Sequence, residues 1–138
     1  MQFAPILKGV RHMINQKRIE DYGVSIGELP KGRLNKITDV KGVRVGHCTI
    51  DTEESKTGVT VILPMEENIY MNKLVAASYV LNGFGKTTGL VQIDELGTLE
   101  SIIALTNTLN VGLVYDAVVD YMIEECNKEN VELETFNP

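Results

Sequence analysis

The residues best suited to bind or act on a ligand lie in one glycine-rich stretch, 82–88. It reads Asn-Gly-Phe-Gly-Lys-Thr-Thr and is followed at once by Gly89. Glycines at this density permit tight turns or leave room for a ligand close to the backbone. Lys86 and the two threonines are the polar groups that such a turn presents. We therefore look for function here first.

The Gly-Lys-Thr sequence at 85–87 matches the end of a phosphate-binding P-loop, but the rest of that motif is absent. A P-loop has another glycine five positions earlier, so that successive N–H groups surround the phosphate. Val80 stands there and belongs to a strand-like apolar run. The dinucleotide pattern G-x-G-x-x-G fails as well, because the three glycines are spaced G-x-G-x-x-x-G. We therefore discount nucleotide binding.

Length and composition are typical of one globular domain. The chain has 138 residues, of which 43% are hydrophobic and 23% charged. Its net charge of −6 argues against nucleic acid or an anionic membrane as partner. Two cysteines, no signal peptide and no long apolar run predict a reduced, cytoplasmic setting. Because no His or Cys cluster is visible, we expect neither a metal nor another cofactor.

The elements that must position the glycine-rich stretch are predicted from hydrophobic patterning. Apolar or alternating runs predict strands at 22–28, 43–50, 57–63, 74–81 and 101–106. Apolar spacing predicts helices at 88–96 and 111–126. The second helix has one narrow polar stripe, which predicts that it is covered on most sides. Strands and helices that are partly segregated along the chain indicate an α+β or layered α/β fold.

His47 and Cys48 are two further side chains that often carry chemistry. As neighbours on a predicted strand, they point to opposite faces of the sheet. They cannot pair with each other as nucleophile and base. We interpret both as structural residues, Cys48 as a small buried hydrophobic side chain.

Six short blocks of the sequence recur in the same order in one known group of hydrolases. They are Asn35–Val40, Gly42–His47, Thr57–Thr60, Val80–Gly85, Glu95–Glu100 and Thr106–Gly112. On these blocks the chain resembles the L-aminopeptidase/D-esterase family, the DmpA-like peptidases of family P1 or S58. The resemblance runs from about Tyr22 to Cys126 and so covers most of the chain.

The resemblance implies a fold and a type of chemistry. The family has a layered αββα sandwich of the N-terminal-nucleophile type, so this chain would be the N-terminal part of such an α+β fold. We expect residues 1–20 to form an arm or short helix and 21–138 a partial α-chain domain. A family precursor cleaves itself before a Ser or Thr, whose hydroxyl becomes the nucleophile. The complete enzyme would be an oligomeric aminopeptidase, amidase or esterase that needs no cofactor.

We expect the nucleophile itself to lie outside this chain. The sequence begins at Met1, and none of its serines stands in the cleavage context of the family. Its last residue, Pro138, precedes the usual end of the family's α chain. The partners would be the remaining α segment, the β chain and a small peptide, amide or ester substrate. The chain alone would be inactive; the alternative is a non-catalytic ligand-binding or scaffold module of the same fold.

Four residues of the glycine-rich stretch match positions of interest in the family. Phe84 matches a substrate-lining position, with core packing as the alternative, and Thr88 a position near the reacting centre. Asn82 either contacts substrate or caps the turn. Lys86 stands where aminopeptidase members carry an acid that holds the substrate's ammonium. A lysine would repel that group and prefer a carboxylate or oxyanion, so Lys86 is the candidate catalytic residue, and a solvated turn lysine is the alternative.

Overall fold

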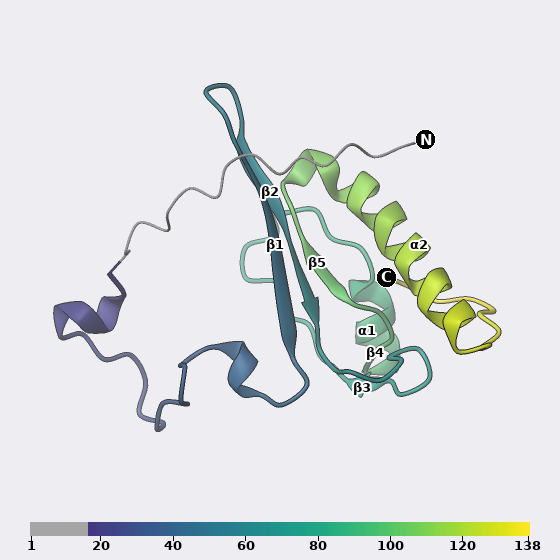
Figure 1. Cartoon of the computed structure of the whole chain (residues 1–138), viewed down its shortest axis with the longest axis horizontal. Coiled ribbons are helices and arrows are strands. Elements are labelled where there is room, and N and C mark those ends of the chain that lie inside the picture. Colours follow the sequence, from purple (N-terminus) through teal and green to yellow (C-terminus); the bar gives the residue numbers. More distant parts are fainter. Residues whose placement is uncertain (1–16) are drawn as a thin grey trace. The chain divides into compact units, whose positions relative to one another are not determined.

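The computed structural model describes residues 17–138, which belong to two compact units (Figure 1). The first unit ends at Lys31, and the second spans Gly32–Pro138. The arm expected at residues 1–20 lies mostly outside the described residues. That arm and the domain boundary after it stay predictions.

In the first unit the described residues form one turn of 3-10 helix, η1 (Ile19–Tyr22). Gly23 ends it with a φ of 75° and donates its N–H to the Glu20 carbonyl at 2.9 Å. The strand predicted at 22–28 is wrong. Gly23 and Gly27 both adopt positive φ values, 75° and 84°, which interrupt an extended backbone.

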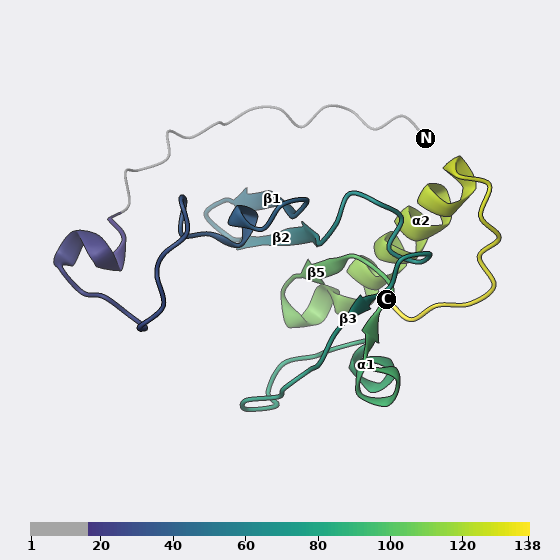
Figure 2. The same ribbon diagram turned by 90° about the horizontal axis from the view of Figure 1, so that it is seen from below.

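The second unit contains a three-stranded antiparallel sheet in the order β1-β2-β5 (Figures 1 and 2). Strands β1 (Arg44–Asp51) and β2 (Lys56–Leu63) form a hairpin, and β5 (Ile103–Leu105) pairs with the other edge of β2. The strands predicted at 43–50 and 57–63 are thereby confirmed. The strand predicted at 101–106 is present as β5 but is shorter than predicted.

Two positions allow the strands of the hairpin to pair closely, Gly58 and His47. A Cβ atom at Gly58 would overlap the carbonyl oxygen of Cys48 on the neighbouring strand, so only glycine fits there. His47 lies directly opposite Thr60, and its Nδ1 is 2.8 Å from the threonine hydroxyl. This cross-strand contact supports the structural interpretation of His47. Cys48 is exposed, so the expectation that it is buried is wrong.

A second, two-stranded sheet is formed by β3 (Leu74–Val75) and β4 (Thr98–Leu99). The longer strand predicted at 74–81 is wrong beyond its first two residues. A strand needs a partner for its backbone groups, and β4 supplies only two residues. The last backbone bond along this edge runs from the Ala76 N–H to the Gly97 carbonyl at 2.9 Å.

Both predicted helices are confirmed as α1 (Leu90–Leu96) and α2 (Val111–Lys128). Gly97 ends α1 with a φ of 67°, in the left-handed region that glycine adopts without strain. Two short 3-10 turns complete the unit, η2 (Ile37–Asp39) and η3 (Thr108–Asn110). The antiparallel sheets and partly segregated helices confirm the α+β class. In the described part of the chain, no helix is long and apolar enough to cross a membrane.

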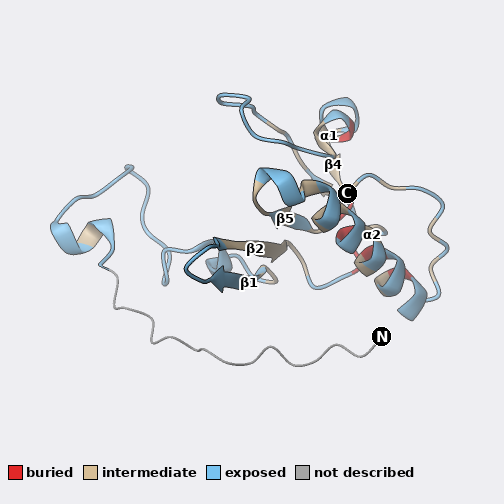
Figure 3. Ribbon diagram, turned by 90° about the horizontal axis from the view of Figure 1, so that it is seen from above, coloured by how far each residue is buried: buried red, intermediate tan, exposed pale blue. Residues whose placement is uncertain are grey.

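The hydrophobic core is small and lies along one side of α2 (Figure 3). Its buried residues are Ile69, Val118 and Met122, with these partly buried apolar residues around them: Met65, Tyr70, Leu74, Leu99, Ile102, Ala104, Val114, Tyr121 and Phe136. The sequence predicted cover on most sides of α2 and a buried strand at 101–106. Instead, Leu113 of α2 is 70% exposed and Leu105 of β5 is 56% exposed. Residues of the described part leave these faces uncovered.

Candidate functional site

The second unit contains a hollow of about 510 Å³, which is called the cleft from here on. Sites for small molecules usually have volumes of roughly 300–1,000 Å³, so the cleft is large enough for a ligand. Its walls are the end of β4, the segment 101–106 that contains β5, the first half of α2, the start of α1 and three further irregular segments. The lining residues in those segments are Ala76–Tyr79, Lys86–Gly89 and Asn137–Pro138.

The glycine-rich stretch contributes its second half to the cleft. Lys86 and Thr88 line it, whereas Asn82 and Phe84 are not among its lining residues. The Asn82 side-chain oxygen accepts the Phe84 N–H at 3.0 Å, which is the turn-capping arrangement that the sequence left open. The Phe84 side chain is 86% exposed, so it is no part of the core. The structure therefore brings together two of the four predicted site residues.

One charged side chain lines the cleft. Of the lining residues, all of which lie in the described part of the chain, Lys86 alone has a charged side chain. Several hydroxyl groups accompany it, and the remaining walls are largely apolar. The hydroxyl-bearing lining residues are Ser78, Tyr79, Thr87, Thr88, Ser101, Thr106 and Tyr115. Ser78 donates its hydroxyl to the Asp94 carboxylate, which is not among the lining groups. Such a site suits a neutral or negatively charged ligand.

Next to the cleft lies a buried acid that the sequence analysis did not single out. Glu100 is only 4% exposed and pairs with the Lys73 ammonium at 2.8 Å. Its other carboxylate oxygen accepts the Asn137 N–H at 2.9 Å. Burial raises the pKa of Glu100, but the hydrogen bonds from Lys73 and Asn137 outweigh burial, so this pKa lies below its ordinary value. The same hydrogen bond from Lys73 raises the pKa of that lysine.

Sequence reasoning also missed the tail residues of the cleft, Asn137 and Pro138. They lie far along the chain from the glycine-rich stretch, and no local pattern connects the two segments. For Glu100 one signal was present, because it ends Glu95–Glu100, one of the six blocks that carry the resemblance. Glu100 stands directly before an apolar sequence that was predicted to be a buried strand. A carboxylate at such a position needs a charged or hydrogen-bonding partner if it is buried.

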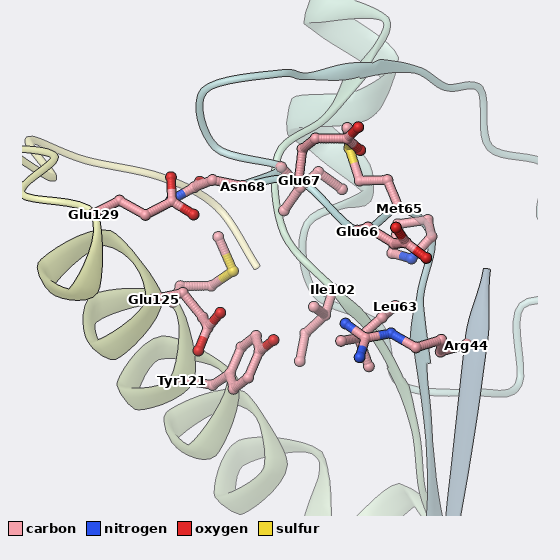
Figure 4. A pocket seen from close by; sticks show the side chains of 13 residues that line it. Arg44, Leu63, Met65, Glu66, Glu67, Asn68, Ile102, Tyr121, Glu125 and Glu129 are labelled. Atoms are coloured by element: carbon pink, nitrogen blue, oxygen red, sulfur yellow. The ribbon is translucent and has the colours of Figure 1, made fainter. Parts of the chain in front are cut away.

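A second hollow, shown in Figure 4, is too small for a substrate. Its volume is about 40 Å³, little more than the roughly 30 Å³ that one water molecule occupies in the liquid. Arg44 of β1 lies on one side of it, and Tyr121 and Glu125 of α2 lie on the other. Burial, followed by the nearby Glu125 charge, raises the pKa of Tyr121. Within residues 17–138, no group of three or more potential metal ligands converges.

Comparison with known proteins finds a matching family model and related sequences, all of them peptidases. The model of peptidase family S58 matches residues 35–138. The beta-peptidyl aminopeptidase BapA of Sphingosinicella xenopeptidilytica is 38% identical over 121 residues, which cover 81% of this chain and 30% of the relative. BapA of Sphingosinicella microcystinivorans is 35% identical over 116 residues, or 78% of this chain and 29% of the relative. The chain thus spans less than a third of the length of these curated relatives.

Solved structures are similar to this chain in both fold and sequence. A protein of Pyrococcus horikoshii OT3 superposes with a TM-score of 0.73 at 46% identity, over 77% of this chain and 33% of that one. A beta-aminopeptidase of Burkholderia sp. gives 0.71 at 47% identity, over 78% and 32%.

The third structure is the L-aminopeptidase D-Ala-esterase/amidase of Ochrobactrum anthropi, described as a new variant of the Ntn-hydrolase fold. It gives a TM-score of 0.75 at 28% identity, over 89% of this chain and 36% of that one. The resemblance predicted from the six sequence blocks is confirmed by these matches. With a family model that matches from Asn35 to Pro138, the chain belongs to peptidase family S58.

Proposed function

We propose that this chain supplies one part of the substrate site of an enzyme that hydrolyses peptides, amides or esters. The observation that carries the proposal is the cleft itself, since a member of a peptidase family has its glycine-rich stretch in the wall of a ligand-sized hollow. The named relatives are aminopeptidases, which supports an acyl-transfer reaction on a small substrate.

The attacking group is proposed to come from polypeptide outside this chain. Among the described residues that line the cleft there is no histidine and no cysteine. The hydroxyl of Ser101 donates to the Ile102 carbonyl at 3.1 Å and has no base beside it in that contact. A nucleophile that acts through its own α-amino group needs no such base. We therefore assign the nucleophile to a Ser or Thr freed by self-cleavage on a segment that joins this one.

The proposed roles of the site residues follow from their placement. Lys86 would orient a substrate carbonyl or carboxylate, or stabilise the oxyanion that forms during acyl transfer. Thr88 would donate a hydrogen bond from the same wall. Asn82 would hold the turn, and Phe84 would present an aromatic surface to the substrate from the exposed loop. No cofactor enters this scheme.

The partners of the chain are proposed to be the remaining α segment and the β chain of the same enzyme, assembled into a cytoplasmic oligomer. Large apolar side chains stay exposed in this unit, among them Leu105, which lines the cleft, and Leu113 of α2. Contiguous exposed apolar surface marks an interaction site. Covering these faces would also close the cleft from water.

The experiment compares this chain with a longer protein that includes the segment encoded after it. The assay is hydrolysis of leucine p-nitroanilide and of a β-amino-acid p-nitroanilide. We expect no turnover by residues 1–138 alone. The longer protein should split into two chains, as seen by intact mass, and should then turn over one of the substrates. Replacing the new N-terminal Ser or Thr by Ala should abolish both events. Turnover by the short chain would refute the proposal that the nucleophile lies outside it.

A non-catalytic binding or scaffold module is the second candidate. It is favoured by the lack of a hydroxyl–base pair among the described residues that line the cleft. If the longer protein stays uncleaved and inert but binds the substrate amides, this second function is the correct one.

A further inference from the structure

We propose that Glu100, which does not line the cleft, is a positioning residue for it and holds the C-terminal segment in place as a cleft wall. This segment, residues 131–138, is called the tail below. The inference rests on the proposed function, because it concerns the same cleft. Neither Glu100 nor the tail has a role in the proposed function as described so far.

The tail returns from the end of α2 to the core. Asn130 has a φ of 55°, and the N–H of Val131 bonds the Cys126 carbonyl at 2.9 Å, so the chain reverses directly after the helix. Phe136 then packs against the cluster of Ile69, Val118 and Met122. The last two residues, which follow Phe136, reach the cleft and line it.

Glu100 anchors the tail at the point where it enters the cleft. Both of its carboxylate oxygens are used, Oε2 by the Lys73 ammonium at 2.8 Å and Oε1 by the Asn137 N–H at 2.9 Å. A carboxylate that is only 4% exposed needs such partners, because an unpaired buried charge is costly. Its two bonds therefore join the tail to the β3–β4 sheet.

The β3–β4 sheet places the ion pair. Leu74 lies opposite Leu99 in the antiparallel register. The residues that flank this pair, Lys73 and Glu100, therefore face each other across the two strands. Lys73 remains 42% exposed, so the ion pair reaches from the buried carboxylate to the surface.

The tail contacts the glycine-rich stretch directly. A Cβ atom at Gly89 would lie only 2.7 Å from the carbonyl oxygen of Pro138. Gly89 follows Lys86–Thr88 and has a φ of 77°, which favours glycine as well. A tail released from Glu100 would leave Gly89 without this neighbour. The width of the cleft beside Lys86 therefore depends on Glu100.

The test uses NMR on the 138-residue chain with three variants. Glu100→Ala removes both bonds, Glu100→Gln keeps an oxygen for the Asn137 N–H, and Lys73→Met removes only the ion pair. Glu132→Gln, at an exposed tail position, is the matched control. The readouts are hydrogen exchange of the Asn137 amide, the amide resonance of Gly89 and the affinity for N-acetyl-L-leucinamide.

With Glu100→Ala we expect the Asn137 amide to exchange roughly tenfold faster, as for the loss of one hydrogen bond. The Gly89 resonance should shift, and the probe should bind about fivefold more weakly. Glu100→Gln should retain most of the protection of the Asn137 amide. Lys73→Met should give an exchange rate of this amide between those of Glu100→Ala and Glu100→Gln. Glu132→Gln should match the wild type in all readouts.

Two results would overturn the proposal. One is an unchanged Gly89 resonance although Asn137 is released. The other is loss of protection throughout α2 to the same extent as at Asn137, which would mean that Glu100 acts on overall stability only. The Gly89 readout needs no ligand, so it decides the role of Glu100 even if the wild type fails to bind the probe. Failure of the wild-type chain to bind the probe, or failure of the longer protein to cleave itself and hydrolyse an anilide, would count against the proposed function instead.

Discussion

At the scale of single residues, we expect the charge of Lys86 to give the cleft a preference for anionic ligands. We compare N-acetyl-L-leucine, its neutral amide and L-leucinamide, whose net charges are negative, zero and positive. Because Lys86 has the only charged side chain among the described lining residues, the acid should bind best. Lys86→Gln should weaken binding of the acid roughly fivefold, weaken binding of the neutral amide less and favour the cation, as measured by calorimetric titration.

The control for this prediction is Lys41→Gln, a change at an exposed lysine outside the cleft. It should leave all three affinities at the wild-type level, and high salt should reduce the preference for the acid. Equal binding of acid and cation by the wild type would mean that Lys86 is a solvated turn lysine.

Glycine density and polar side chains are local properties, so the sequence alone directed attention to Lys86 and Thr88, which line the cleft. Their roles there stay predictions. The sequence was insufficient for Asn137, whose place in the cleft depends on the path of the tail around the core. It also left the role of Asn82 open. The hydrogen bond from the Phe84 N–H shows a turn cap, a distinction that needs the geometry of the turn.

At the scale of elements, the β1–β2 hairpin depends on one glycine. Gly58→Ala would push a methyl group into the Cys48 carbonyl, so we expect the free energy of unfolding to fall by about 1–3 kcal/mol. Gly46→Ala is the matched control on the facing strand, because nothing lies within 4 Å of its added Cβ. Urea denaturation measures both. Equal effects of the two changes would contradict the overlap.

The ion pair beside β3 and β4 predicts a dependence of stability on pH. The pKa of Glu100 is lowered in the folded state, so its contribution is present above the ordinary pKa of a glutamate and is lost as the pH falls through the lowered value. The pKa of Lys73 is raised, so its contribution is present at neutral pH and is lost as the pH rises through the raised value.

Glu100→Gln should therefore lower the free energy of unfolding by about 1–2 kcal/mol at pH 7, a modest amount because Lys73 is partly solvated. The difference from the wild type should shrink below about pH 4, where the carboxylate becomes protonated. Denaturant titrations at both pH values measure it, with Glu132→Gln as control. A difference that stays constant with pH would exclude the ion pair as its source.

The helices were predicted well and the short strands poorly, for a physical reason. A helix such as α2 satisfies its own backbone, so its apolar spacing and polar stripe are visible in the sequence. A strand exists only where a partner strand runs beside it. The apolar run at 74–81 therefore stops being a strand where β4 ends, and no property of the run itself indicates this.

At the scale of the whole molecule, the small core and the exposed apolar faces are the main departure from an ordinary domain. The sequence has enough apolar residues for a full core, yet large side chains on α2 and β5 remain exposed. A large exposed apolar surface on a soluble protein often marks a site of interaction. The sequence predicted a covered helix, and the described residues supply cover on one side of it only.

The exposed face of α2 can be tested by measuring one change in two contexts. Leu113 is 70% exposed here, so Leu113→Gln should change the free energy of unfolding of this chain by less than about 0.5 kcal/mol. In a longer protein whose additional segment covers α2, the same change would bury an amide. It should then cost more than about 1 kcal/mol. Chemical denaturation of both proteins measures the difference.

Asp120→Asn, an exposed position on the polar stripe of the same helix, is the control for Leu113→Gln and should be nearly neutral in both proteins. A Leu113→Gln effect that is the same in the short and the long protein would mean that this face stays in water. The additional polypeptide would then have to reach the cleft past β5, where Leu105 also exposes a large apolar side chain.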